Sequence, residues 1–247
     1  MQTKHVPRLD PLYWATLSLA SVFGTNTGDI ISHMLHLGDF RGLPLLALMF
    51  AGILFAERRA RAAGTVYYWL AIIVLRTAAT NLADFGSLQF ELDYATMIAG
   101  LAVLLAAVLF VGHRLRAAKA RASEAALPPG TLSVDGIYWT AMLTAATLGT
   151  ALGDFGSHTL TLRVCSVVSV TLLAAAFFLV RGATSDTAIY WATIVIARTA
   201  GTNIGDLLAF RKGLNLGLPL STLVTGLLFF GLVLFGVRRS AAVSRNA

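Results

Sequence analysis

The segment from Tyr13 to Asp29 reads YWATLSLASVFGTNTGD, and its pattern returns three more times along the chain. The later copies are YWLAIIVLRTAATNLAD from Tyr68, YWTAMLTAATLGTALGD from Tyr138, and YWATIVIARTAGTNIGD from Tyr190. In every copy Thr follows the Trp by 11 positions and Asp follows it by 15. The recurring residues are Trp14, Trp69, Trp139 and Trp191; Thr25, Thr80, Thr150 and Thr202; and Asp29, Asp84, Asp154 and Asp206. A fixed internal period of this kind predicts a repeat architecture with four carboxylates at one register.

These positions share one face of a helix. Each residue turns an α-helix by ~100°, so positions +7, +11, +15 and +18 after the Trp lie within an arc of roughly 80°. They form a polar stripe that includes the Trp itself. Beside the stripe, positions +10 and +14 are small in every copy: Gly24 and Gly28, Ala79 and Ala83, Gly149 and Gly153, Gly201 and Gly205. This spacing predicts close helix packing in a membrane.

The composition also indicates a membrane protein. Of the 247 residues, 57% are hydrophobic and 13% are charged, and the mean hydropathy is +0.74. Soluble domains carry about 25% charged residues, so we expect a multi-pass membrane protein in contact with a lipid bilayer. The net charge of +7 is not gathered in basic runs with interleaved aromatics, so no nucleic-acid partner is expected. No helical HExxH, GxSxG or phosphate-loop motif is present, so no enzyme is expected.

Eight segments are apolar enough to predict spans, since a span needs ~20 largely apolar residues. The second and sixth are short, which predicts tilt, local thinning or extension into the flanks. The predicted spans are Leu12 to Leu37, Leu43 to Ala56, Val66 to Leu88, Tyr94 to Leu115, Ile137 to Leu160, Val164 to Val180, Ala188 to Phe210, and Leu216 to Val237.

Basic residues set the expected orientation, because they concentrate in cytoplasmic loops. Thirteen of them fall on one side of the eight predicted spans and four on the other. Both termini are therefore expected in the cytoplasm. Residues 1–117 would form a first half, 118–135 a cytoplasmic linker with Pro128-Pro129-Gly130, and 136–247 a second half.

Each repeat consists of a motif helix and a second helix that is almost purely apolar. Polar stripes are costly against lipid, so the four motif helices should form an inner bundle surrounded by the other four. Two-helix repeats keep one direction, which predicts an all-α membrane protein with a pseudo-fourfold axis along the membrane normal. Position +7 is Arg only in the second and fourth copies, and position +19 is His only in the first and third. The two halves are therefore more alike than the two repeats within a half.

At this point the sequence resembles bacterial integral membrane proteins built from four tandem two-helix repeats of unknown function, each marked by a tryptophan. The resemblance covers essentially the whole chain through the four Trp residues and their downstream Thr and Asp. It implies a multi-pass protein of the bacterial inner membrane. It brings no assigned activity, so function has to come from the residues.

The four aspartates are the first candidate site. They lie ~22 Å beyond the tryptophans at ~1.5 Å per residue. Four carboxylates facing one axis cannot all stay ionised in a dry site, so they would share protons, bind a cation or line water. Alternatively, each could bond Thr, Asn or Trp of a neighbouring helix and only hold the bundle together.

Arg76 and Arg198 at position +7 are the second candidate. Helical side chains lean toward the helix N-terminus, so both should point away from the aspartates. We expect them to face a cytoplasmic water cavity, where they would hold an anionic group or influence the carboxylates from a distance. The alternative is snorkelling, or bonding to backbone carbonyls and lipid phosphates.

A third candidate is a metal site made of Asp29, His33, Asp154 and His158, because each His follows an Asp by one helical turn. The same residues could form a proton relay, or the two His could hold haem, which is less expected; otherwise they bond locally. Any cofactor therefore stays unknown. The Tyr-Trp pairs are expected at the membrane interface, or as four indoles that close the inner mouth.

Together these features predict a transporter or channel-like protein for a small cation, a divalent metal or a proton. The aspartates would coordinate the cation, the threonine hydroxyls would add neutral ligands, and Arg76 and Arg198 would limit the negative charge. The alternatives are a membrane haem- or metal-binding redox or sensor protein that uses the two His, and a structural membrane subunit.

Overall fold

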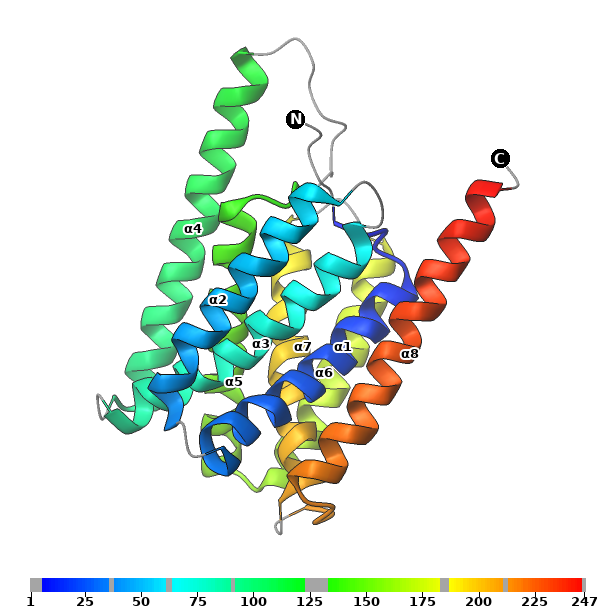
Figure 1. The fold of residues 1–247 in the computed structure, drawn as a ribbon. Coiled ribbons are helices and arrows are strands. Elements are labelled where there is room, and N and C mark those ends of the chain that lie inside the picture. The colour runs from blue at the N-terminus through cyan, green and yellow to red at the C-terminus, as the bar shows by residue number, and fades with distance from the viewer. Residues whose placement is uncertain are drawn as a thin grey trace.

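A computed structural model describes residues 6–35, 38–60, 64–89, 92–122, 133–182, 187–210 and 213–245 (Figure 1). Within these ranges the chain forms eight α-helices and one short π-helical segment, and it contains no β-strand. The predicted all-α class is confirmed. The elements are α1 (Pro11–Asp29), η1 (Ile30–Met34), α2 (Gly38–Arg59), α3 (Gly64–Gln89), α4 (Tyr94–Ala122), α5 (Gly136–Thr159), α6 (Leu162–Gly182), α7 (Thr187–Ala209) and α8 (Leu218–Arg245).

Each helix coincides with one of the predicted segments. The two that looked short, α2 and α6, extend into their flanks, as one of the predicted options required. Two motif helices begin at the same kind of cap: the carboxylate of Asp10 accepts from the Tyr13 amide, and that of Asp135 accepts from the Tyr138 amide, each at 2.9 Å. Such caps satisfy amides that have no partner inside the helix, so they fix where the Tyr-Trp pair starts its helix.

The motif helices α1, α3, α5 and α7 contact one another in cyclic order. α1 packs on α3 and α7, and α5 packs on α3 and α7. The second helix of each repeat packs mainly on the motif helix of the next repeat: α2 on α3, α4 on α5 and α6 on α7. The last helix, α8, packs on α1 and so closes the circle (Figure 1).

The small residues lie where neighbouring motif helices touch. A Cβ added to Gly24 would meet Arg76 Cβ at 2.8 Å, and one added to Gly28 would meet Thr80 Cβ at 2.9 Å. The equivalent glycines of α5 face α7, and those of α7 face α1. The small-xxx-small prediction is confirmed for these three contacts, which leave no room for a side chain.

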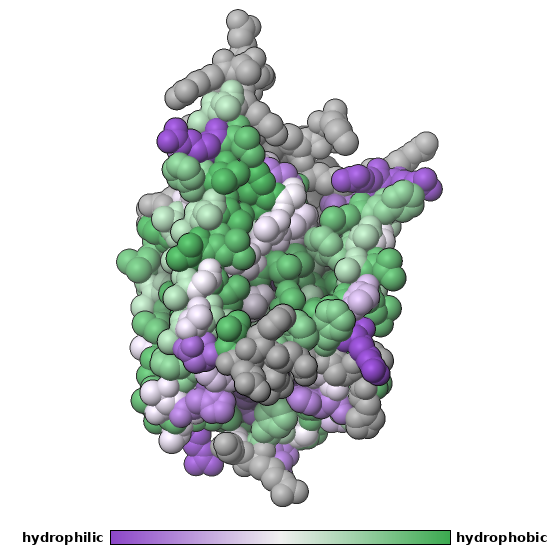
Figure 2. Space-filling model, turned by 90° about the vertical axis from the view of Figure 1, so that its left-hand side faces the viewer, coloured by the Kyte–Doolittle hydropathy of each residue, from purple (hydrophilic) through white to green (hydrophobic). Residues whose placement is uncertain are grey.

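Five helices, α2, α3, α4, α6 and α8, contain segments long and apolar enough to cross a membrane. α1, α5 and α7 do not qualify, and each carries Thr, Gly and Asp along its length. In α3, 67% of the qualifying window is buried inside the protein, against 11% in α2 and 17% in α4. Apolar side chains dominate the outer face shown in Figure 2, which supports the predicted contact with lipid.

α1 begins at the same end of the molecule at which α2, α4 and α8 finish (Figure 1). The basic residues Arg58 and Arg59, Arg114 and Arg116, and Arg238 and Arg239 come near the last turns of those three helices. Most of the predicted linker 118–135, residues 123–132, lies outside the described residues. The division into two halves stays a prediction.

Candidate functional site

The centre of the molecule is lined by every fourth residue of the motif helices, beginning at the Tyr before each Trp. We call these positions, −1, +3, +7, +11 and +15 relative to the Trp, the axial row. In α1 the row is Tyr13, Leu17, Ser21, Thr25 and Asp29, and all five side chains are buried. Rows of this spacing are inclined to the helix axis, so tilted helices that cross one another can present them along one line. The other rows are Tyr68, Ile72, Arg76, Thr80 and Asp84; Tyr138, Met142, Ala146, Thr150 and Asp154; and Tyr190, Ile194, Arg198, Thr202 and Asp206.

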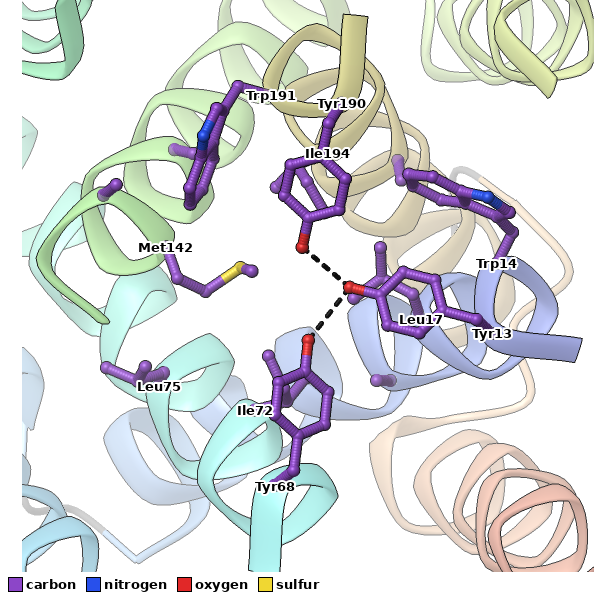
Figure 3. Packing of buried hydrophobic residues seen from close by; sticks show 14 of the residues in the cluster. Tyr13, Trp14, Leu17, Tyr68, Ile72, Leu75, Met142, Tyr190, Trp191 and Ile194 are labelled. Carbon is purple, nitrogen blue, oxygen red and sulfur yellow. Dashed lines mark hydrogen bonds between the residues drawn. The ribbon is translucent and has the colours of Figure 1, made fainter. Parts of the chain in front are cut away.

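The first layer is a closed ring of four tyrosine hydroxyls, here called the tyrosine ring. The oxygen–oxygen distances are 2.9 Å for Tyr13–Tyr68, 2.7 Å for Tyr68–Tyr138, 2.9 Å for Tyr138–Tyr190 and 2.8 Å for Tyr190–Tyr13. A hydroxyl donates once and can accept as well, so all four can be satisfied without water. Figure 3 shows three of these hydroxyls meeting at the centre. The ring therefore closes this end of the axis.

The four tryptophans lie between neighbouring motif helices and not on the axis. Trp14 packs beside Tyr190 at 5.8 Å between ring centroids, and Trp69 packs beside Tyr13 at 5.5 Å. Trp139 and Trp191 repeat this contact with the preceding motif helix, and Figure 3 shows Trp14 and Trp191 outside the hydroxyl ring. Four indoles closing the mouth were the alternative to anchoring at the membrane interface, and that alternative is wrong because tyrosine hydroxyls lie there. The signal was the Tyr that precedes every Trp.

Arg198 lies toward the tyrosine ring. Its Nη1 donates to Ser21 Oγ at 3.0 Å and its Nη2 donates to Met142 Sδ at 3.4 Å. Its Nε has no hydrogen-bond partner and its side chain is fully buried. The guanidinium is therefore desolvated with one oxygen and one weak sulfur acceptor.

Arg76 points the opposite way and lies among one threonine from each motif helix, here called the threonine ring. Its Nη1 donates to Thr150 at 2.7 Å and Thr80 at 3.1 Å, and its Nη2 donates to Thr25 at 2.5 Å and Thr202 at 2.7 Å. The predicted lean toward the helix N-terminus is wrong for Arg76, because four acceptor oxygens lie on its C-terminal side. The predicted water cavity is also wrong, since both arginines are 0% exposed.

The aspartates form the last layer, called the aspartate layer. Asp29 is buried, and its Oδ2 has no hydrogen-bond partner. The other three are half-buried. Asp29 interacts electrostatically with the other three carboxylates, and the Arg76 guanidinium acts on Asp29, Asp154 and Asp206. The axial rows thus carry two guanidinium groups and four carboxylic acids, with the acids at the less enclosed end.

The two histidines do not join the aspartates. His33 and His158 are exposed in the last turns of η1 and α5, and the His158 ring packs against Tyr94 at 5.4 Å between centroids. Within the described ranges, no three His, Cys, Asp or Glu side chains form a group that could hold a metal ion. Asp29, His33, Asp154 and His158 are described, so the structure does not bring them together as a metal site.

An additional polar contact joins the motif helices to their covering helices, and sequence reasoning did not find it. Asn26, next to Thr25, donates to Ser221 Oγ of α8 at 3.1 Å. Asn203, next to Thr202, donates to Cys165 Sγ at 3.1 Å and Ser169 Oγ at 3.2 Å in α6. The Thr-Asn pair present in three copies was the available signal.

Residues 189–241 match a known family model. They correspond to a Repeat of Unknown Function (DUF347). The matched repeat holds most of α7, with Arg198, Thr202 and Asp206, and most of α8. The resemblance to a repeat family of unknown function is therefore confirmed. No curated protein and no solved structure matches the chain. The repeat's description names no activity, so function has to be argued from the axial rows.

Proposed function

We propose that the protein is an integral membrane transporter of a small cation, with the aspartate layer as the site where the cation first binds. The observation that carries this proposal is the aspartate layer at the less enclosed end of the axial rows. Carboxylates this near one another attract a cation or retain protons, because desolvation and mutual repulsion disfavour four bare charges. An anion would be repelled from the same position.

In the proposed arrangement all eight helices cross the bilayer, and α1, α3, α5 and α7 form a pseudo-fourfold inner bundle. The polar surfaces of α1, α5 and α7 would then be covered by neighbouring helices, which accounts for their lower apolar content. The basic ends of α2, α4 and α8 support cytoplasmic termini in a bacterial inner membrane. The tyrosine ring would face the cytoplasm, and the aspartate layer would lie toward the opposite side.

The arrangement corresponds to a closed state. The tyrosine ring and the two buried arginines block the axis beyond the aspartates. Passage of a cation therefore requires a second conformation in which the arginines move and the tyrosine ring opens. Transporters commonly alternate between two such conformations. The threonine hydroxyls cannot be cation ligands in this state, because Arg76 occupies them. In this proposal Arg76 offsets part of the aspartate charge, since its guanidinium acts on Asp29, Asp154 and Asp206.

Protons are favoured over a divalent metal as the cation. The described residues contain no ready group of metal ligands, whereas carboxylic acids carry protons without a fixed coordination geometry. The histidine-based haem or redox alternative has no support from the exposed positions of His33 and His158. The structural-subunit alternative keeps support from Arg76, whose four bonds join all four motif helices.

The test is proton flux into proteoliposomes that contain the purified protein and a pH-sensitive dye. Asp206→Asn and Asp84→Asn should each lower the flux at least about tenfold, since one tenfold step is only 1.4 kcal/mol of barrier. Asp93→Asn is the matched control, because Asp93 is an exposed acid in the loop before α4. A variant with all four aspartates changed to asparagine and unaltered flux would contradict the proposal. A correctly folded protein that moves no cation would favour the structural subunit.

A further inference from the structure

The threonine ring has an unusual chemical character for a buried site, because it presents acceptors only. Each threonine hydroxyl donates its hydrogen to the carbonyl four residues earlier in its own helix. The oxygen–oxygen distances are 2.9 Å for Thr25, 3.4 Å for Thr80, 3.3 Å for Thr150 and 3.2 Å for Thr202. With the hydrogens directed to the helices, the lone pairs are left for the axis.

Four acceptors around one point suit a cation that carries several N–H donors. Arg76 demonstrates the fit, since its two terminal nitrogens donate to all four hydroxyls. The aspartate layer is the next layer of the axial rows and adds negative potential, which favours a cation further. Anions and neutral acceptors have nothing to bond to in this ring.

The ring has room for one guanidinium, yet the chain supplies two arginines at the same repeat position. Arg198 shows what the second does: it turns toward the tyrosine ring and bonds Ser21 and Met142. A side chain at position +7 can therefore stay buried without entering the threonine ring. If Arg76 adopted the direction of Arg198, the ring would be vacant and next to the aspartates. By the repeat correspondence Arg76 would then face Ala146 and Leu17, which offer no side-chain acceptor, so another cation has to take over the four hydroxyls.

From this geometry we infer that the threonine ring is a binding site for a small nitrogen cation, a guanidinium or primary ammonium ion, which Arg76 occupies in this structure. The inference rests on the proposed cation transport and goes beyond the proton favoured above, because it names a nitrogen cation as an ion that passes from the aspartate layer to the next layer. Arg76 is then an internal competitor of the transported ion. Each withdrawal of its side chain admits one cation.

Binding can be tested in purified protein without transport. The probe is guanidinium, at millimolar concentrations below those that denature, and sodium at equal ionic strength is the reference. Arg76→Ala should show a saturable guanidinium-dependent rise in its thermal unfolding midpoint, and adding Thr150→Val should reduce the apparent affinity at least tenfold. Arg198→Ala is the matched control and should show no such rise. The inference is overturned if Arg76→Ala shows no saturable rise, or if Arg198→Ala shows an equal one.

Uptake of radiolabelled guanidinium by wild-type proteoliposomes gives a second test that does not depend on the folding of the Arg76 variant. Uptake that falls at least tenfold in Thr150→Val, but not in Thr140→Val on the exposed side of α5, supports the inference. Proton flux without guanidinium uptake, and without inhibition by guanidinium, overturns it and leaves the proposed function standing. Saturable binding to Arg76→Ala, with no cation flux in the wild type, overturns the proposed function and leaves the ring as a cation site.

Discussion

Arg76 and Arg198 occupy the same position in the second and fourth repeats, and the structure gives them opposite surroundings. Arg76 has four hydroxyl acceptors drawn from all four motif helices. Arg198 has one hydroxyl and one thioether, on the other side of the same position. Equivalent sequence positions in a repeat protein therefore need not have equivalent surroundings. The threonine ring holds only one guanidinium, so one arginine enters it and the other has to bond elsewhere.

The neighbours of the two arginines explain which one enters the threonine ring. Arg198 bonds Ser21 of the first repeat and Met142 of the third. Exchanging the two halves of the chain would give Arg76 the corresponding residues Ala146 and Leu17, neither of which has a side-chain acceptor. Only Arg198 has partners outside the ring. Two substitutions between the halves thus break the twofold relation of the repeats.

The largest expected difference in stability is between two variants in which an arginine is replaced by methionine, which keeps most of the side-chain volume but removes the charge. Arg76→Met should lower the free energy of unfolding by about 3–5 kcal/mol, because a buried charged network loses its central member and the aspartates lose a counter-charge. Arg198→Met should change it by less than about 1 kcal/mol, since a poorly partnered buried charge contributes little net stability. Denaturant-induced unfolding in detergent micelles measures both. Equal losses would show that the two surroundings do not differ in energy.

A smaller effect is expected where the glycines face the two arginines. A Cβ at Gly24 would lie 2.8 Å from Arg76 Cβ, and one at Gly149 would lie 3.0 Å from the Thr199 backbone nitrogen. Gly24→Val and Gly149→Val should each cost about 1–3 kcal/mol by overpacking the helix contact. Gly100→Val and Gly231→Val are controls, because a Cβ added there would meet no heavy atom within 4 Å apart from its chain neighbours and the nearby backbone of its own helix. Similar losses of stability at Gly24 and Gly149 would show that the two arginines differ in their side-chain bonds and not in the packing of their helices. If only one of the two positions tolerates valine, the helix packing itself differs around the two arginines.

The smallest effect concerns the tyrosine ring, which lies near Arg198 but far along the axial row from the aspartates. Changing the opposite pair Tyr13 and Tyr138 to Phe removes all four hydroxyl bonds, whereas changing the adjacent pair Tyr13 and Tyr68 leaves the Tyr138–Tyr190 bond. At roughly 0.5–1.5 kcal/mol per hydrogen bond, the opposite pair should be less stable than the adjacent pair by about one bond. Thermal unfolding of the two double variants measures the difference. Identical midpoints would argue against a closed ring.

The sequence was sufficient for the helices, for the close contacts through glycine, and for the threonine and aspartate positions on one face. It was not sufficient for the direction of Arg76, because the general lean of helical side chains is weaker than four acceptors contributed by other helices. The tyrosine ring was not predicted because the stripe was counted from the Trp, whereas the inclined row begins one residue earlier. The sequence also could not predict that α2 packs on α3 and α8 on α1, since four similar repeats offer several equivalent partners for each helix.

The way α4 and α8 pack has a consequence for how the protein can be assembled. Helix α4 of the first half packs on α5 of the second half, and α8 of the second half packs on α1 of the first. Cutting the chain between α4 and α5 would therefore give two fragments that still contact each other through α4 on α5 and α8 on α1. Co-expressed as separate polypeptides, they should reassociate, whereas either one alone would leave a polar helix without its cover.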